Sequence, residues 1–216
     1  MELLDEHEQG ERVRTWLREN GTAILGGIAL GVAAIFSWQW WQGSQERDRI
    51  AAADQYHRLS EAVAASDADG MRALAGQLQT DFPGNPYAML AALHLAELEL
   101  GEGNSEAAAQ TLEHARTTAT DPALRGVATL RLARVRIARG EFEQALTLLA
   151  DAQLAEDYAG LAAELRGDAL AALGREHDAR GAYAEALSIL DIAAPNRSII
   201  EMKLAAVGGR AESPET

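Results

Sequence analysis

Cysteine is missing from this sequence, and aromatic side chains are scarce. Because the 216 residues include no cysteine, a disulfide framework and thiolate chemistry are both excluded. Aromatic residues make up only 5% of the chain while alanine is abundant, which favours closely packed helices over a β-sandwich. The few prolines all lie at or beyond the ends of the helices predicted below. No helix interior is therefore broken by proline.

Positive charge is also in short supply. The chain has 19 lysines and arginines against 33 acidic residues, which gives a formal net charge of −14. Residues 1–50 contribute −3 of this charge, and the remainder of the chain contributes −11. An acidic domain repels phosphate groups, which argues against nucleic acid as the main partner.

No charged residue occurs between Glu19 and Glu46, and residues 21–41 are the apolar part of this stretch. As a helix it would span roughly 30 Å, about the hydrocarbon thickness of a bilayer. Trp16 precedes the stretch and Trp38, Trp40 and Trp41 crowd its end, as in the aromatic belts at membrane surfaces. A cleaved signal peptide would have a shorter apolar core, and a buried soluble helix would have a polar stripe. We therefore predict an uncleaved transmembrane helix over residues 21–41.

The flanks of this helix bear on its orientation. Residues 1–20 form a short tail that either lies along the membrane surface or extends the helix. Arg12, Arg14 and Arg18 precede the helix, and they are nearly balanced by Arg47, Arg49 and, further along the chain, Arg58. The positive-inside rule therefore favours a cytoplasmic N-terminus by a narrow margin.

Two glycines inside the predicted anchor are spaced for contact with another helix. Gly27 and Gly31 stand one turn apart, and small residues at this spacing let transmembrane helices approach closely. We predict that Gly27 and Gly31 form such a contact. The alternative is that glycine is simply common in membrane helices.

The rest of the chain repeats a pair of amphipathic helices. Glycines that end the first helix of a pair recur at spacings of 37 and 34 residues: Gly103, Gly140 and Gly174. A small residue seven positions before each glycine is matched by a larger one nine positions after it: Ala96 with Leu112, Ala133 with Leu149, Gly167 with Tyr183. Such pairs let antiparallel helices pack closely. The pattern resembles the tetratricopeptide repeat of about 34 residues.

The fold class that follows is all-α, with one N-terminal transmembrane helix and then a tetratricopeptide-like α-solenoid over residues 42–207. Residues 50–82 are predicted to form a divergent first repeat, and residues 196–207 a last capping helix. Asn85 and Asp121 each precede a proline and are predicted to cap the helices that follow. Residues 208–216 are polar and are predicted to be disordered.

The sequence offers no arrangement of residues for catalysis. None of the five histidines lies in a metal-binding motif, and neither a phosphate-binding glycine loop nor a nucleophile elbow occurs. We therefore expect a protein that is not an enzyme and has no cofactor.

Five arginines gather on one repeat with no acidic residue between them: Arg125, Arg131, Arg134, Arg136 and Arg139. In an acidic domain they could meet an acidic partner. Alternatively they pair with Glu141, Glu143 and the acids of adjacent helices, which we favour for the group. Arg134 is the expected exception because of its place in the repeat.

The tetratricopeptide resemblance implies a concave groove lined by residues of the first helices. The candidate lining residues are Leu90, Leu93, Glu97, Leu100, Val127, Leu130, Arg134, Ile137, Leu161, Glu164, Asp168 and Ala171. Among them we select as binding residues Leu93, Glu97, Leu130, Arg134, Ile137, Glu164 and Asp168. Apolar residues mixed with a few charges suit an extended or helical peptide. The leucines could instead belong to the core between repeats.

The chain as a whole resembles the YfgM-type ancillary subunits of the bacterial Sec translocon. The resemblance rests on the order of tail, anchor and repeats and on three segments, at residues 14–21, 130–135 and 165–170. It implies a single-pass inner-membrane protein with a cytoplasmic N-terminus and periplasmic repeats. It also implies association with SecYEG, with the membrane-anchored periplasmic chaperone PpiD and with translocating polypeptides.

The function that we expect is therefore that of a membrane-anchored binding module, which helps pass translocated proteins to periplasmic chaperones. A structural scaffold for envelope assembly or cell division, with the same groove and one fixed partner, is the alternative.

Overall fold

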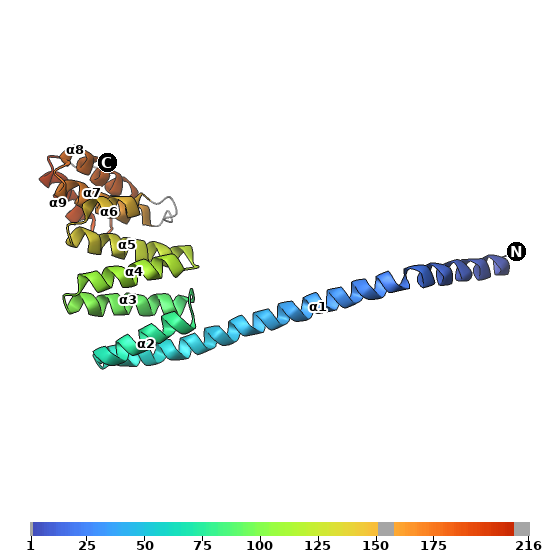
Figure 1. Cartoon of the computed structure of the whole chain (residues 1–216). Helices are drawn as coiled ribbons and strands as arrows, with labels where there is room; N and C mark the ends of the chain where they lie inside the picture. The colour runs from blue at the N-terminus through green and yellow to red at the C-terminus, as the bar shows by residue number, and fades with distance from the viewer. Residues whose placement is uncertain (1, 151–157, 210–216) are drawn as a thin grey trace. The chain divides into compact units, whose positions relative to one another are not determined.

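The structure is a computed structural model, and its described residues are 2–150 and 158–209 (Figure 1). Within these ranges the regular elements are all α-helices and no strand occurs. In chain order they are α1 (Glu2–Ala64), α2 (Ala68–Asp81), α3 (Pro86–Gly101), α4 (Ser105–Thr118), α5 (Pro122–Ala138), α6 (Phe142–Leu149), α7 (Ala159–Ala172), α8 (Glu176–Ile189) and α9 (Arg197–Ala206). The predicted all-α fold is confirmed.

The chain divides into two units, Met1–Ile50 and Ala51–Thr216. In its described backbone the first unit is helical from Glu2 onward, as part of α1. The tail therefore extends the anchor helix, which is one of the two alternatives that the sequence leaves open. The helix also continues beyond residue 41, because neither a proline nor a cluster of turn residues stands in its way.

The first unit contains a helical stretch with an uncovered apolar surface. Part of α1, from Arg18 onward, is long and apolar enough to cross a membrane, and its most apolar window has no buried residue. The rings of Trp38 and Trp41, at the end of the predicted span over residues 21–41, lie with centroids 5.3 Å apart. A helix of this length and composition fits a hydrocarbon surrounding better than water.

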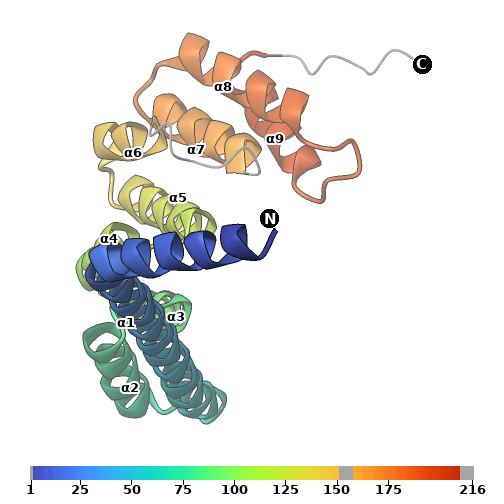
Figure 2. The same ribbon diagram turned by 90° about the vertical axis from the view of Figure 1, so that its right-hand side faces the viewer.

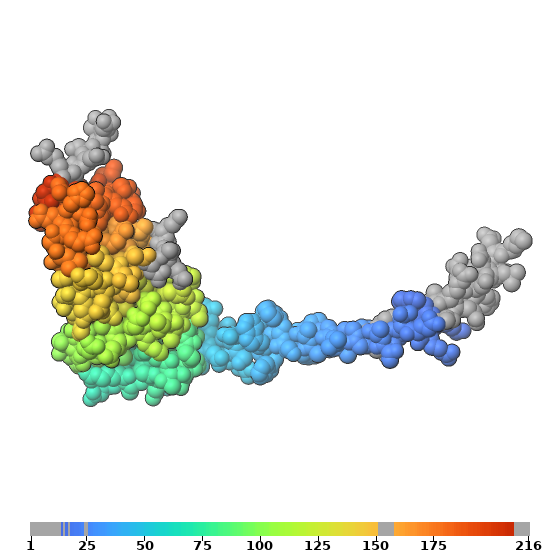
Figure 3. Space-filling view, turned by 45° about the horizontal axis from the view of Figure 1, so that its top comes forward, coloured from blue at the N-terminus to red at the C-terminus, as the bar shows by residue number. Residues whose placement is uncertain are grey.

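The second unit is a stack of helix pairs. The end of α1 packs against α2 through a core that includes Leu59 and Leu78. The pairs α3–α4, α5–α6 and α7–α8 follow, and each contacts the next. In the space-filling view the pairs succeed one another in chain order (Figure 3). Helix α9 then packs beside α7 and α8 at the C-terminal end of the stack (Figure 2).

The same turn ends the first helix of each pair. Gly103, Gly140 and Gly174 have φ angles of 79°, 79° and 73°, a left-handed conformation that glycine adopts without steric cost. The residue after each glycine donates its backbone N–H to a carbonyl five residues earlier, with N···O distances of 2.8, 2.8 and 2.9 Å. This hydrogen bond is the Schellman motif. The three glycines therefore mark the repeat for a physical reason.

Two further turns belong to the same series. Ser66 takes the glycine's place between α1 and α2, with φ at 55°, and the N–H of Asp67 bonds to the carbonyl of Ala62. Residues 50–82 thus form a repeat that diverges at its turn. After α9, Gly208 has a φ of 75°, and the N–H of Gly209 bonds to Leu204.

The predicted small–large pairs explain how the helices approach each other. A Cβ atom added to Gly167 would lie 2.4 Å from the ring of Tyr183, so only glycine leaves room for this ring. Ala96 and Leu112 are buried in one core cluster, and Ala133 and Leu149 in another.

The predicted caps are also present. Asn85 accepts a hydrogen bond from the backbone of Tyr87, and Asp121 accepts bonds from Ala123 and Leu124. The predicted C-terminal helix is α9. Of the tail for which disorder is predicted, residues 210–216 lie outside the described residues.

Candidate peptide-binding groove

A groove lies between the first helices α3 and α5. It has a volume of about 340 Å³ and is lined by Ala96, Glu97, Leu100, Leu112, Arg131, Arg134, Val135 and Ala138. Leu112 and Val135 are buried and form its apolar floor, whereas Glu97, Arg131 and Arg134 are exposed. Leu100 keeps 44% of its surface exposed. The groove therefore combines an apolar floor with charged groups at its rim.

Arg131 and Arg134 differ from the other arginines of α5. Arg136 and Arg139 both bond to Glu141, at 2.7 Å each, so the predicted pairing with that carboxylate is confirmed. Arg125 donates to the carbonyl of Ala119 at 2.9 Å. Within residues 2–150 and 158–209, Arg131 and Arg134 make no ion pair or hydrogen bond. At this groove the acidic domain thus presents two arginines whose charges are not paired with described residues.

The predicted site residues separate into two groups. Glu97 and Arg134 lie together at the groove rim. Leu93 and Leu130, however, are only 8% and 4% exposed and belong to core clusters, and Ile137 is partly buried against the cluster that contains Leu130. Leu130 and Ile137 lie on the side of α5 that packs against α6 and α7. Leu93 shares its side of α3 with Glu97 and Leu100 but is covered by its neighbours in the core. We therefore correct their placement from groove lining to core.

Glu164 and Asp168 are engaged by the C-terminal helix. The ammonium group of Lys203 in α9 lies 2.8 Å from a carboxylate oxygen of each residue. The hydroxyl of Tyr183 donates to Asp168 at 2.8 Å, and Asn196 donates to Glu164 at 3.3 Å. This network, which we call the α9 clamp, leaves neither carboxylate free. Both carboxylates therefore have partners within the chain, and their role in peptide binding stays a prediction.

The α9 clamp changes the ionisation of its members. Burial raises the pKa of the Tyr183 hydroxyl, and its hydrogen bond to Asp168 raises it further. Burial acts to lower the pKa of Lys203, but hydrogen bonds and charge from Asp168 and Glu164 outweigh it and raise the pKa overall. Both shifts favour the protonated forms that the network requires.

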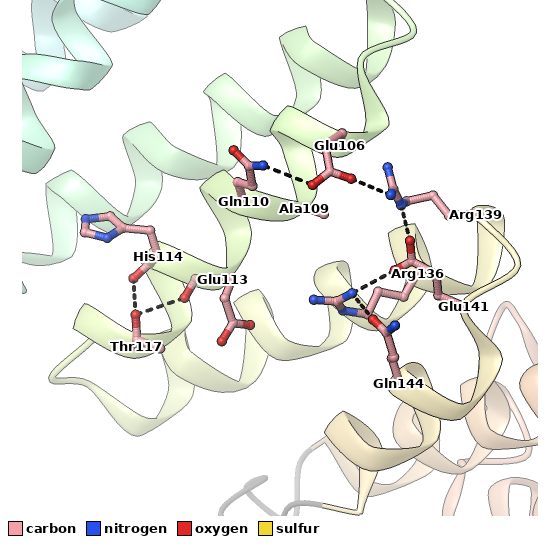
Figure 4. Close-up of a pocket in the computed structure, with 10 residues that line it drawn as sticks. All are labelled: Glu106, Ala109, Gln110, Glu113, His114, Thr117, Arg136, Arg139, Glu141 and Gln144. Atoms are coloured by element: carbon pink, nitrogen blue, oxygen red, sulfur yellow. Dashed lines mark hydrogen bonds and ion pairs between the residues drawn. The ribbon is translucent and has the colours of Figure 1, made fainter.

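A second hollow, formed by α4, the end of α5 and the start of α6, is polar and has a volume of about 570 Å³ (Figure 4). Its charged groups mostly satisfy each other, since Arg136 also bonds to Gln144 and Arg139 to Glu106. The hydrogen bond from Arg139, together with that from Arg136, lowers the pKa of Glu141. Arg136 and Arg139 of this hollow are therefore already paired within the chain, unlike Arg131 and Arg134 at the groove.

Sequence reasoning missed several groove residues. Leu112 comes from a second helix, which the expected lining does not include, and Val135 and Ala138 lie on α5 between and beyond the selected positions. Arg131 could have been found, because it stands three residues before Arg134 and shares its side of the helix. Among the described residues, no group of three or more His, Asp or Glu side chains is placed to hold a metal ion.

Comparisons with known proteins agree with this architecture. The model of the family described as "Tetratricopeptide repeat-like domain" matches residues 14–209. A crystal structure of nearly identical TPR-like repeats from Podosopora anserina aligns with a TM-score of 0.56, covering 74% of this chain and 85% of that one at 17% identity. At this identity the likeness concerns the fold. The fold and the groove define a tetratricopeptide-like repeat protein.

Two curated relatives identify the family more closely. The "Ancillary SecYEG translocon subunit" of Escherichia coli K12 is 32% identical over 167 residues, which are 77% of this chain and 80% of the relative. The protein of the same name from Haemophilus influenzae is 29% identical over 146 residues, which are 68% and 71% of the two chains. The chain belongs to the family of ancillary SecYEG translocon subunits.

Proposed function

We propose that this protein is a membrane-anchored, polypeptide-binding module that works beside the Sec translocon. The single observation that carries the proposal is the groove between α3 and α5, in which uncommitted Arg131 and Arg134 border an apolar floor. Family membership supports the location, because the relatives are named as translocon subunits. A groove of this kind binds segments of protein.

The binding surface that we propose is smaller than the first-helix pattern predicts. It consists of Glu97, Leu100, Arg131 and Arg134 above a floor that includes Val135. Exposed apolar area attracts the side chains of an unfolded segment, and the two cations favour segments that carry carboxylates.

The anchor places this groove at the membrane. We propose a single pass through the inner membrane, with a cytoplasmic N-terminus and the repeats in the periplasm. Gly27 and Gly31 are proposed to meet a helix of the translocon, and a Cβ atom at either position would find nothing within 4 Å in this chain. That open space would allow a partner helix to approach closely.

The partners that follow are SecYEG, the periplasmic chaperone PpiD and polypeptides that emerge from the channel. Tethering raises the effective concentration of the groove near the channel exit, so weak contacts suffice for transient binding. Weak contacts also allow release, which a step that passes a polypeptide to a periplasmic chaperone requires.

Photo-crosslinking in living cells tests this proposal. The crosslinking amino acid is placed at Leu100 in the groove and, separately, at Ile28 in the anchor, since both side chains are exposed. Leu130 is unsuitable because it is buried. His177 on α8, exposed and outside the groove, is the matched control.

The expected result is that Leu100 traps translocating polypeptides and chaperones, that Ile28 traps subunits of the channel, and that His177 traps neither. A single stoichiometric envelope protein trapped at Leu100 would instead support the scaffold alternative. The absence of channel subunits at both test positions would overturn the location at the translocon.

A further inference from the structure

Helix α9 has the position relative to its turn glycine that the first helix of each pair has. Gly208 follows Gly174 by 34 residues, adopts the same left-handed conformation and closes the same turn. Helix α9 can therefore be aligned with α5 by counting back from the glycine of each turn. Positions six and nine before the glycine are Arg134 and Arg131 in α5. In α9 the same positions are Met202 and Ile199.

Contacts within the structure support this alignment. Five residues before the glycine, α5 has Val135, which lines the groove together with Glu97 of the preceding first helix. In α9 the same position is Lys203, which bonds to Asp168 of the preceding first helix, α7. Glu97 and Asp168 both lie six residues before their own glycines. The edge between α7 and α9 thus corresponds to the edge at which the groove runs between α3 and α5.

The other side of α9 is suited to end the stack. In α5 the residues that meet the following helices include buried Leu130 and Ala133 and partly buried Ile137. At the matching positions α9 has Ser198, Glu201 and Ala205. A polar or small outer face is expected of a capping element in a repeat protein. Stacking therefore does not account for Ile199 and Met202, which are 50% and 71% exposed.

We infer that the groove continues onto α9 as an apolar subsite formed by Ile199 and Met202. Its occupant is a polypeptide segment with carboxylates over Arg131 and Arg134 and a large apolar side chain over α9. The charge of Asp168, which such a segment would pass on the way, is already balanced by Lys203. This inference rests on the proposed function and specifies which segments the same groove prefers.

The fold sets the spacing between the two recognised features. Helices α5 and α9 are separated by two steps from one first helix to the next, roughly 20 Å at the usual distance between packed helices. An extended chain covers this distance in about six residues. The preferred segment therefore has its apolar side chain about six residues from its acidic pair.

Fluorescence anisotropy with synthetic peptides and the full-length protein in detergent micelles tests this specificity. The probe is a labelled Gly/Ser peptide with two glutamates and a leucine six residues away, made in both sequence orders. Three control peptides replace the leucine by serine, replace the glutamates by glutamines, or shorten the spacing to two residues. The protein variants are I199S/M202S, Arg134→Ala and Ile192→Ser, the last as a matched control.

Ile192 serves as the control because it is 70% exposed but precedes α9, so it has no counterpart among the groove-lining positions. We expect I199S/M202S to weaken binding of the leucine peptide about tenfold, the effect of exposing one apolar side chain. Its binding of the serine peptide is expected to stay unchanged. Arg134→Ala weakens both peptides, and Ile192→Ser changes neither.

The outcomes separate the inference from the proposal beneath it. If the wild-type protein binds the leucine and serine peptides equally well, and Arg134→Ala weakens both, the groove stands and the apolar subsite is refuted. If I199S/M202S weakens both peptides to the same degree as Arg134→Ala, the subsite is likewise refuted. If no peptide binds, or if Arg134→Ala has no effect on binding, the proposed function fails together with the inference.

Discussion

Gly167 lets two helices touch where a larger residue would separate them. Its substitution by alanine would bring a Cβ atom to 2.4 Å from the ring of Tyr183, and this ring is held in place by its hydrogen bond to Asp168. We expect Gly167→Ala to lower the free energy of unfolding by about 1–3 kcal/mol, the usual cost of overpacking a core. Chemical denaturation of the full-length protein in detergent, followed by circular dichroism, measures the change.

A second glycine provides the control for this substitution. Gly181 lies in the neighbouring α8, and a Cβ atom there would meet nothing within 4 Å. Gly181→Ala is expected to raise the free energy of unfolding by about 0.5–1 kcal/mol, because alanine is the better helix former. Equal effects of the two substitutions would contradict the proposed close approach of α7 and Tyr183.

Lys203 is the one lysine in the sequence, and it balances a buried carboxylate. Glu164 is only 8% exposed, so Lys203→Met would leave its charge without a cation. We expect a loss of about 2–3 kcal/mol in the free energy of unfolding, since removing one partner of a buried pair costs more than the pair itself contributes. The double variant E164Q/K203M, which removes the stranded charge, is expected to recover part of this stability. If the double variant is no more stable than K203M, the role assigned to Glu164 is wrong.

The packing of helix α9 against α7 should weaken at alkaline pH. The folded pKa values of Lys203 and Tyr183 are both raised above their ordinary values. Each group therefore contributes its full stabilisation below its unfolded pKa of about 10 and loses it as the pH rises through the folded value. As the pH rises through the raised pKa of Lys203, the ammonium group loses its proton, and Glu164 and Asp168 then repel each other. We expect α9 to detach from α7 in this range.

Reaction of Lys203 with an amine-specific reagent measures this detachment, because Lys203 carries the one side-chain amine in the chain. Reaction should be slow at pH 9 and should accelerate above pH 10 by more than the deprotonation of a free lysine explains. The variant E164Q/D168N, which lacks both carboxylates, is the control and should react rapidly already at pH 9. Rapid reaction of the wild-type protein at pH 9 would contradict the clamp.

The turns show why the repeats could be predicted from the sequence. A left-handed turn that closes a Schellman motif strongly prefers glycine, so Gly103, Gly140 and Gly174 report a backbone requirement directly. The small–large pairs are equally local, because each residue lies at a fixed distance from its turn. The number and order of the helix pairs follow from signals of this kind.

The groove lining was harder to predict, because a first helix meets neighbours on several sides. Leu93 and Glu97 are separated by one helical turn, yet Leu93 is buried and Glu97 is exposed. The repeat pattern alone does not say which apolar residue faces the next helix and which faces solvent. The contact of Lys203 with Glu164 joins residues 39 positions apart, and no local signal in the sequence indicates that contact.

In the function that we propose, the two units of the chain contribute different properties. The repeats contribute the groove, which is small and lined by both polar and apolar residues. A surface of this size is expected to bind weakly without the anchor. In this proposal the anchor confines that groove to the membrane, and confinement near a channel would raise its effective concentration to about the millimolar range when the linkage is short. Binding that is weak in solution can therefore be effective at the membrane and still permit release.

Removal of the anchor separates these contributions. Deletion of residues 1–45 is expected to abolish co-purification with SecYEG from detergent-solubilised membranes, because the remaining groove binds too weakly to survive washing.

A chimera in which an unrelated transmembrane helix replaces residues 21–41 tests whether tethering alone suffices. If Gly27 and Gly31 make a specific helix contact, this chimera and the variant G27L/G31L both lose most of the co-purification, since leucine prevents close approach. If the chimera retains it, the anchor serves as a tether without specific contacts. Full retention by the deleted form would place the docking surface on the repeats and contradict any role for the anchor in association.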